Sequence, residues 1–190
     1  MHSTESLHRL RGVGAFRVLL PPLIVYGSVA GVGFALSLAF APVWKVALVA
    51  GSGWLCWTLV EYLIHRFAFH EKPGRPLAQK YDIHWIHHRK PHSPEHIVTS
   101  LRLTIPVALV FGGLFWLLWG GHVLFWAFYS GFVIGYLWYE GLHLSIHVWP
   151  QPPFRWLRPL WRHHHWHHFR DPHKYHGVTT RWWDYVFGSV

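Results

Sequence analysis

Histidines gather in four short segments of this chain, and their spacing suits the binding of metal ions. The chain has 19 histidines, and the four segments read IHRFAFH, HWIHH, HLSIH and HHWHH. Residues three and four positions apart lie on one face of a helix, so the HxxHH and HxxxH patterns present several imidazoles in the same direction. The five-residue spacing of the first segment suits a helix end that unwinds. The predicted metal ligands are His65, His70, His84, His87, His88, His143, His147, His164, His167 and His168.

Ten imidazoles exceed the coordination sphere of one ion, which holds about four to six ligands. The spacing therefore predicts two metal ions. Imidazole binds iron, copper, nickel and zinc, so the ligands alone do not name the metal. A site that faces the acyl region of a membrane meets unreactive C–H bonds, and breaking these bonds requires activated oxygen. That chemistry favours redox-active iron, with O2 as the co-substrate.

Each histidine segment taken alone has a structural explanation. A single HxxxH pattern on a helix is more often structural than a pair of ligands, and a histidine-rich tail can bind anionic lipid. Four such segments on one side of a membrane favour metal binding instead. A histidine-rich membrane protein that binds or transports metal is an alternative of another class. Transport is disfavoured, because a transporter needs ligands near the bilayer midplane and the apolar runs contain almost none.

Carboxylates near the predicted ligands are candidates for holding the imidazoles in position. A metal-binding histidine usually donates its second ring N–H to a carboxylate or a carbonyl. Glu61 lies four residues before His65, and Glu140 lies three residues before His143, each on the same helical face. Acidic groups at membrane depth are rare and usually functional. Further candidates are Asp82, Asp171 and Asp184, the last of which is equally well explained as a residue that locks the fold.

Long apolar runs predict that these segments belong to a membrane protein. Of the 190 residues, 52% are hydrophobic and 13% are charged, with 14 Trp and 13 Phe. A helix needs about 20 apolar residues to cross the hydrocarbon core. We predict a single domain over residues 1–190, an all-α integral membrane fold with four transmembrane helices and a cytosolic histidine-rich cap that holds a dimetal site. The predicted spans are approximately residues 18–40, 43–64, 103–119 and 123–146.

Proline and glycine mark where these spans turn and pack. Residues 41–42 (Ala-Pro) and 120–122 (Gly-Gly-His) separate the spans into two pairs, which predicts two tight helical hairpins. Within the first span, Gly27, Gly31 and Gly33 are small enough to let a neighbouring helix approach closely.

The positive charges predict how the spans are oriented. Sixteen of the 17 Lys and Arg residues fall before the first span, between residues 65 and 102, or after residue 148, and the exception is Lys45. By the positive-inside rule, both termini and the histidine segments are cytoplasmic, in the inner membrane of a bacterium or the endoplasmic reticulum of a eukaryote. The net charge of +9 does not indicate a nucleic-acid partner, because the cations flank apolar runs instead of forming a basic and aromatic stripe.

Taken in order, the patterns HxxxxH, HxxHH, HxxxH and HxxHH resemble those of the membrane fatty acid hydroxylase superfamily, which includes sterol desaturases. The segments HHRKPHSPEHIV, YEGLHLSIH and HGVTTRWWDYVFGS are most similar to fatty acid and ceramide 2-hydroxylases. The resemblance implies four transmembrane helices, a cytosolic dimetal site with the ten histidines as ligands, and oxygen-dependent hydroxylation at C2 of a long acyl chain. It implies iron as the active metal and zinc as an ion that can occupy the isolated protein. Oxidation of a carotenoid or sterol by the same histidine pattern is the alternative enzyme function.

The chain departs from this pattern at several positions. His176 stands where an aromatic or small residue is expected, so it is a candidate for an extra ligand or a substrate contact. His163 and His165 flank His164 and make the register of the last pattern less definite, although only His164 completes HxxHH. Glu95 stands where the resemblance implies aspartate, which bears on the exact substrate. The tail before the first span is too short for the haem-binding domain of some relatives. We therefore expect a separate electron donor, a haem or iron–sulfur carrier with its reductase.

Overall fold

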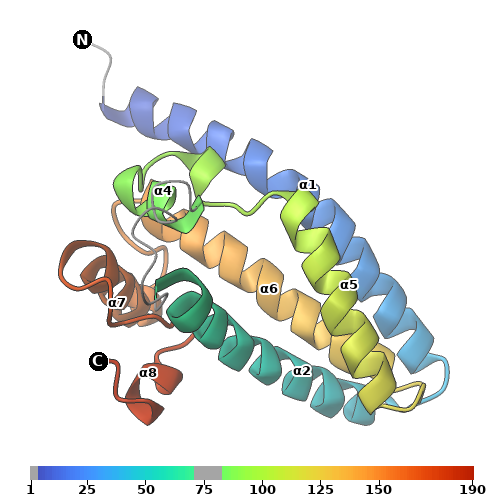
Figure 1. The fold of residues 1–190 in the computed structure, drawn as a ribbon. Coiled ribbons are helices and arrows are strands. Elements are labelled where there is room, and N and C mark those ends of the chain that lie inside the picture. Colours follow the sequence, from blue (N-terminus) through green and yellow to red (C-terminus); the bar gives the residue numbers. More distant parts are fainter. Residues whose placement is uncertain (1–3, 71–82) are drawn as a thin grey trace. The chain divides into compact units, whose positions relative to one another are not determined.

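A computed structural model describes residues 4–70 and 83–190, so the candidate Asp82 lies outside the described residues. All regular elements within these two ranges are helices (Figure 1), as the sequence predicts. In chain order they are α1 (Thr4–Leu38), α2 (Val43–Leu63), the π-helix η1 (Ile64–His70), α4 (Ile83–Arg89), the 3-10 turn η2 (Pro94–His96), α5 (Leu101–Leu118), α6 (Phe125–Val148), the 3-10 turn η3 (Arg155–Leu157), α7 (Arg158–Phe169) and α8 (Trp182–Val186).

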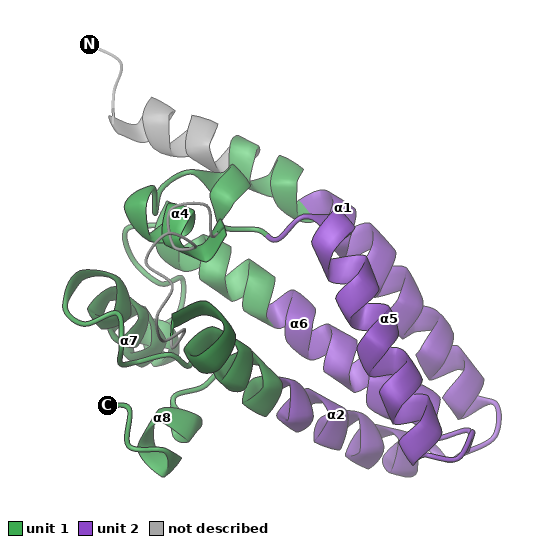
Figure 2. Ribbon diagram, in the orientation of Figure 1, with its two compact units in different colours: residues 1–19, 58–98, 139–190 green, residues 20–57, 99–138 purple. Residues whose placement is uncertain are grey.

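The helices form two compact units that alternate along the chain (Figure 2). The first unit comprises residues 1–19, 58–98 and 139–190, and the second comprises residues 20–57 and 99–138. Helices α1, α2 and α6 each contribute residues to both units. All ten predicted ligands belong to the first unit. The prediction of a single domain over residues 1–190 stays a prediction.

Among residues 4–70 and 83–190, three helical segments are long and apolar enough to cross a membrane, namely Gly14–Leu38, Val43–His70 and Pro94–Leu118. They correspond to the first three predicted spans. Helix α1 begins at Thr4, well before the apolar run, and it continues through two consecutive prolines, which membrane helices tolerate when the freed backbone groups are satisfied locally. The fourth predicted span corresponds to α6, which has 24 residues.

The turn between α5 and α6 lies at the two glycines that the sequence marked. Gly120 and Gly121 have φ angles of 57° and 73°, which lie in the left-handed region that glycine adopts without steric cost. The predicted helix break at this position is confirmed.

Side-chain hydrogen bonds connect α6 to its neighbours within the second unit. The Ser130 hydroxyl donates to the carbonyl of Ala30 in α1 at 3.0 Å, and the Tyr129 hydroxyl donates to the carbonyl of Ala108 in α5 at 2.7 Å. Such bonds between membrane helices each contribute roughly 1 kcal/mol. Helix α6 is therefore bonded to both α1 and α5.

Glycine allows α2 and α6 to approach each other closely. A Cβ atom at Gly53 would lie 1.9 Å from the carbonyl oxygen of Phe128, and one at Gly131 would lie 1.9 Å from that of Ala50. No side chain fits at such distances. The two backbones are therefore in direct contact at these two glycines, as in other helix pairs with small interface residues.

The glycines of the first span contribute less than the sequence suggests. A Cβ at Gly33 would lie 2.3 Å from the hydroxyl of Ser130, but nothing lies within 4 Å of the same position at Gly27 or Gly31. The prediction of a close approach was wrong for these two residues. Small size permits a close approach, but only packing decides which face of the helix meets a neighbour.

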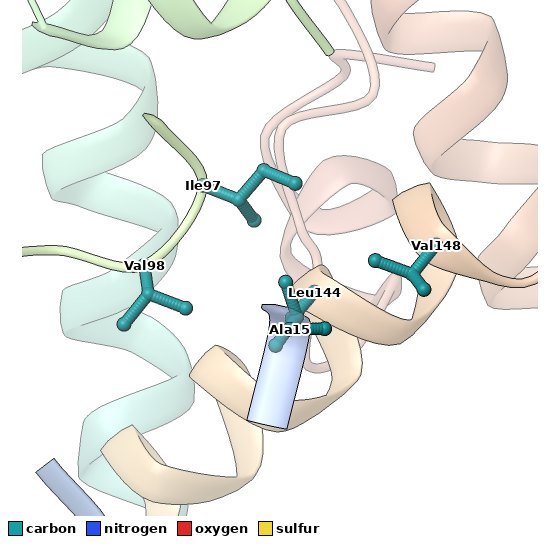
Figure 3. Packing of buried hydrophobic residues seen from close by; sticks show 5 residues of the cluster. All are labelled: Ala15, Ile97, Val98, Leu144 and Val148. Atoms are coloured by element: carbon teal, nitrogen blue, oxygen red, sulfur yellow. The ribbon is translucent and has the colours of Figure 1, made fainter. Parts of the chain in front are cut away.

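The C-terminal half of α6 presents three rows of side chains in the first unit, each made of residues four apart. In the first row, Leu144 and Val148 pack in a buried cluster with Ala15, Ile97 and Val98 (Figure 3). This cluster joins α6 to residues of α1 and to the segment that follows η2.

Leu142 and Ile146 form the second row and pack in another buried cluster. His143 and His147 form the third row. Successive residues of a helix are rotated by about 100°, so the two apolar rows flank the row of imidazoles. Burial of both apolar rows therefore fixes the direction in which these two imidazoles point. The other members of the second cluster are Leu157, Trp161 and Val178.

A matched pair of glycine variants tests the contact between α2 and α6. Gly53→Ala should destabilise the protein by about 1–3 kcal/mol, because the new methyl group overpacks the contact. Gly51→Ala, two residues earlier on α2, should be neutral or stabilising, because nothing lies within 4 Å of its Cβ position. Thermal unfolding of both variants in the same detergent measures the difference. Equal melting temperatures would contradict the close contact.

Candidate metal centre

The ten predicted ligands lie in two groups of five. Within each group the five candidate ligand nitrogens lie within 4.8 Å of one another. No residue belongs to both groups, and nearly all of these side chains are buried. The first group consists of His65, His70, His84, His88 and His167, and the second group consists of His87, His143, His147, His164 and His168.

Helices α4 and α7 each supply both groups. In the HxxHH pattern of α4, residues i and i+4 belong to the first group and residue i+3 belongs to the second; α7 reverses this assignment. On an α-helix, residues i+4 and i+3 are rotated about 40° and 60° to opposite sides of residue i. The sequence predicts that all three imidazoles point in one direction, and the structure divides them between two directions.

The π-helix η1 explains why the first pattern has a five-residue spacing. His65 and His70 lie five positions apart in η1, and both belong to the first group. On an α-helix, residues five apart point about 140° away from each other. The wider turn of a π-helix, with its i→i+5 hydrogen bonds, brings them closer to the same side. The predicted unwinding at this position was wrong, because the chain remains helical through His70.

The Nε2 atoms of the first group have the spacing that ligands of one ion require. The Nε2 of His84 lies 2.7 Å from that of His70 and 3.1 Å from those of His65 and His88. The Nε2 of His167 lies 3.1 Å from that of His88. Neighbouring nitrogen ligands of an ion at about 2.1 Å are themselves about 3 Å apart.

The second group has the same spacing. The Nε2 of His87 lies 3.1 Å from those of His143 and His168, and the Nε2 of His147 lies 2.9 Å from that of His164. An all-nitrogen donor set of this kind fits iron, copper, nickel or zinc. Both groups are therefore suited to a transition-metal ion.

Burial keeps the imidazoles of α4 and α7 uncharged. Burial, together with neighbouring imidazoles, lowers the pKa of His87 to about 3 and that of His88 to about 4. A neutral imidazole has the free lone pair that a metal ion requires. The same two causes, burial first, lower the pKa values of His84, His164, His167 and His168.

Two imidazoles of the first group are oriented by backbone carbonyls. The Nδ1 of His65 donates to the carbonyl of His176 at 2.5 Å, and the Nδ1 of His167 donates to the carbonyl of Lys174 at 2.7 Å. A carbonyl only accepts, so each ring carries its proton on Nδ1. This tautomer leaves the Nε2 lone pair facing the group.

The predicted carboxylate Glu61 contacts backbone amides. Its two oxygens accept the N–H groups of Val178 at 3.0 Å and Thr179 at 3.1 Å. Glu140 is fully buried on α6, three residues before His143. Sequence reasoning expects each of these two carboxylates to bond directly to a ligand imidazole. For Glu61 the structure instead places backbone amides between the carboxylate and the ligands.

Asp184 also contacts the backbone beside the first group. Its oxygens accept the N–H groups of His176 at 2.8 Å and Gly177 at 2.7 Å. They also accept the Ser189 hydroxyl at 2.8 Å and the Nε2 of His163 at 2.9 Å. Sequence reasoning missed the contacts of His163 and Ser189 with this carboxylate, because no periodic pattern connects these positions.

Two other candidates lie near the site without belonging to either group. The ring of His176 is buried, with its centroid 5.5 Å from those of His70 and His167. Its side chain as an extra ligand or substrate contact stays a prediction. Asp171 accepts the backbone N–H of His173 at 2.9 Å, a local turn of the kind that aspartate commonly makes.

These features define a class of helical protein in which four histidine patterns form two metal-binding groups. The chain belongs to the fatty acid hydroxylase family, whose sequence profile matches residues 50–189. The resemblance found from the histidine patterns is confirmed.

Individual relatives agree with this assignment. The fatty acid 2-hydroxylase of Rattus norvegicus is 32% identical over 160 residues, which cover 73% of this chain and 38% of the rat protein. The dihydroceramide fatty acyl 2-hydroxylase FAH2 of Arabidopsis thaliana is 32% identical over 158 residues, covering 77% of this chain and 62% of that protein. A solved structure of full-length scs7p, with only the hydroxylase domain visible, has a TM-score of 0.81 at 26% identity over 88% of this chain and 64% of that chain. The chain thus spans less than two thirds of each of these proteins.

Metal analysis of neighbouring variants tests the division into two groups. Wild-type protein should bind two ions per chain. His167→Ala and His168→Ala change adjacent residues of different groups, so each should lower the content to about one ion. His165→Ala should retain two, because His165 is exposed and belongs to neither group. Inductively coupled plasma mass spectrometry gives the count. One ion or none in the wild type would contradict the dimetal interpretation.

Removal of the metal should make stability depend on pH. The folded state lowers the pKa of His87 to about 3 and of His88 to about 4, whereas the unfolded value is about 6.5. Between these values the unfolded chain binds more protons, so stability decreases as the pH falls. Chelator-treated protein should therefore melt at a lower temperature at pH 5 than at pH 7.5, and His88→Gln should weaken this dependence. A melting temperature that rises on acidification would contradict the predicted pH dependence.

Proposed function

We propose that this chain is an integral membrane, dimetal hydroxylase that inserts one oxygen atom of O2 into a lipid acyl chain, at C2 of a fatty acid or of a ceramide acyl group. The two groups of five clustered histidines carry this proposal, because their spacing and neutral state suit two redox-active ions. Membership of the fatty acid hydroxylase family supports it. So do the relatives, which are named as a fatty acid 2-hydroxylase and a dihydroceramide fatty acyl 2-hydroxylase.

In this proposal α6 is the fourth transmembrane helix. Its 24 residues extend about 36 Å, which exceeds the hydrocarbon thickness of about 30 Å. Glu140 is the only Asp, Glu, Lys or Arg within it. With four spans, η1 and the end of α6 lie on the same side of the membrane, and the distribution of Lys and Arg makes that side cytoplasmic. The membrane would be the inner membrane of a bacterium or the endoplasmic reticulum of a eukaryote.

The ten histidines would hold two ions through their Nε2 atoms. Bound iron supplies the activation of O2 that attack on a C–H bond requires, whereas zinc would fill the same nitrogen site without redox chemistry. The chain itself provides neutral imidazoles, burial that keeps bulk water away, and backbone carbonyls that fix two of the rings. Hydroxylation consumes O2, two electrons and two protons and also yields water. We therefore propose a separate haem or iron–sulfur carrier, with its reductase, as the electron donor.

The position of the histidines along the spans supports oxidation at C2. Two patterns coincide with the ends of α6 and of the α2–η1 segment, where a span meets the membrane interface. An acyl chain with its polar end at the interface reaches such a site with its carboxyl-proximal carbons first. The methyl end would lie deep in the hydrocarbon region. Substitution at C2 follows from this geometry.

Isotope labelling of lipids tests the reaction. Cells that express the chain should convert a fatty acid with two deuterium atoms at C2 into a 2-hydroxy acyl product that retains one deuterium. Under 18O2 the new hydroxyl should carry the label. Cells that express His87→Ala, which removes a member of the second group, should form no such product. Lipid mass spectrometry measures both labels. A hydroxyl in mid-chain or on a carotenoid or sterol ring would contradict the assignment to C2.

A further inference from the structure

Four consecutive backbone amides between α7 and α8 are held by two buried carboxylates. Asp184 accepts the N–H groups of His176 and Gly177, and Glu61 accepts those of Val178 and Thr179. Asp184 is fully buried and Glu61 is 3% exposed. We call residues 174–179 the positioning loop, because its carbonyls accept from ligands of the first group while its amides donate to these carboxylates.

The conformation of the positioning loop is unusual and leaves little freedom. Tyr175 has a φ angle of 60°, a region that non-glycine residues rarely adopt and that surrounding contacts must maintain. A Cβ at Gly177 would lie 2.1 Å from the carbonyl oxygen of Thr180. The backbone N–H of Tyr175 donates to the carbonyl of Ser189 at 2.7 Å. The loop is therefore held by contacts on both sides of the two carbonyls that accept from His65 and His167.

His163 is the buried partner of Asp184, and both side chains are almost completely enclosed, at 3% and 0% exposure. Burial raises the pKa of Asp184, but hydrogen bonds from His163 and Gly177 outweigh this effect and hold the pKa below its usual value. The carboxylate is therefore charged, and charged acceptors make the stronger hydrogen bonds to backbone amides.

None of the hydrogen bonds found for the described residues joins a second-group imidazole to the positioning loop, and in the first group His70 also has an unpartnered Nδ1. The Nδ1 atoms of four of the five histidines of the second group are buried, and they have no hydrogen-bond partner among residues 4–70 and 83–190. In the first group, by contrast, the Nδ1 atoms of His65 and His167 both donate to the positioning loop. The four unpartnered histidines of the second group are His87, His143, His164 and His168.

We propose that Asp184 and His163 are positioning residues for the first metal ion alone, acting through the positioning loop on His65 and His167. This inference rests on the dimetal function proposed above. His163 thus has a different role from His164, His167 and His168 of the same run: it holds a carboxylate instead of a metal. The two ions are consequently inequivalent, since this loop supports ligands of the first group and none of the second. Outer partners of this kind typically change metal affinity by about 10–100-fold.

Single-site backgrounds separate the two ions. His143→Ala leaves the first group complete, and His70→Ala leaves the second group complete. Asp184→Asn should weaken Zn2+ binding by about 10–100-fold in the His143→Ala background and by less than about twofold in the His70→Ala background. The change replaces one carboxylate oxygen with an amide NH2 group. This group cannot accept the hydrogen bond that a backbone N–H or the N–H of His163 donates in the wild type. Titration of purified protein in detergent against a chelator of known affinity measures both constants.

Conservative variants at His163 distinguish positioning from simple filling of space. His163→Gln keeps a donor for Asp184 and should retain most of the affinity at the first site. His163→Leu fills the space without a donor and should weaken that site as Asp184→Asn does. Ser189→Ala, which removes one weaker donor to Asp184, should act in the same direction with a smaller effect and serves if the other variants fail to fold. His165→Ala changes an exposed histidine of the same helix that belongs to neither group, and it should leave both affinities unchanged.

The outcomes are distinct. Equal weakening in both backgrounds, or none in the His143→Ala background, would overturn the positioning role of Asp184. Full affinity at the first site in His163→Leu would show that His163 has no positioning role. Wild-type protein with fewer than two sites would instead refute the dimetal function from which this inference starts.

Discussion

The close approach of uncharged imidazole nitrogens is the constraint around which the first unit is organised. Neighbouring Nε2 atoms lie 2.7–3.1 Å apart. Two lone pairs at that distance repel each other unless a proton or a cation lies between them. Burial disfavours the proton, because a charged imidazole is costly in an apolar environment. A metal ion satisfies both requirements, so the same burial that keeps the rings neutral prepares them to bind metal.

Helix geometry meets this constraint with few residues. The HxxHH pattern divides its imidazoles between two directions on each of α4 and α7, so that two short helices each supply both groups of histidines. A π-helix brings residues five apart closer to one side in η1. On α6 the row of His143 and His147 lies between two apolar rows, each buried in its own cluster. Hydrophobic packing thus sets the direction of these two ligands.

The carboxylates of the site act on the backbone. Asp184 and Glu61 hold four successive amides, and the carbonyls of the same loop hold two imidazoles. A carboxylate bonded directly to an imidazole would add negative charge close to the metal. A neutral carbonyl fixes the ring with less effect on charge, while the buried acids are satisfied by amide and imidazole donors. The fold thereby combines firm ligand orientation with an all-nitrogen, neutral donor set.

Local spacing along the chain is enough to predict the helical class, the break at Gly120 and Gly121, the ten candidate ligands and the family. Tertiary structure decided which histidines share a group, since that depends on how α4, α7 and α6 meet. It also decided that five-residue spacing means a π-helix, that Gly53 and not Gly27 contacts a neighbour, and that Asp184 acts through a loop. These features arise from contacts between segments far apart in the chain, 111 residues apart for His65 and His176, for which periodicity along the chain carries no signal.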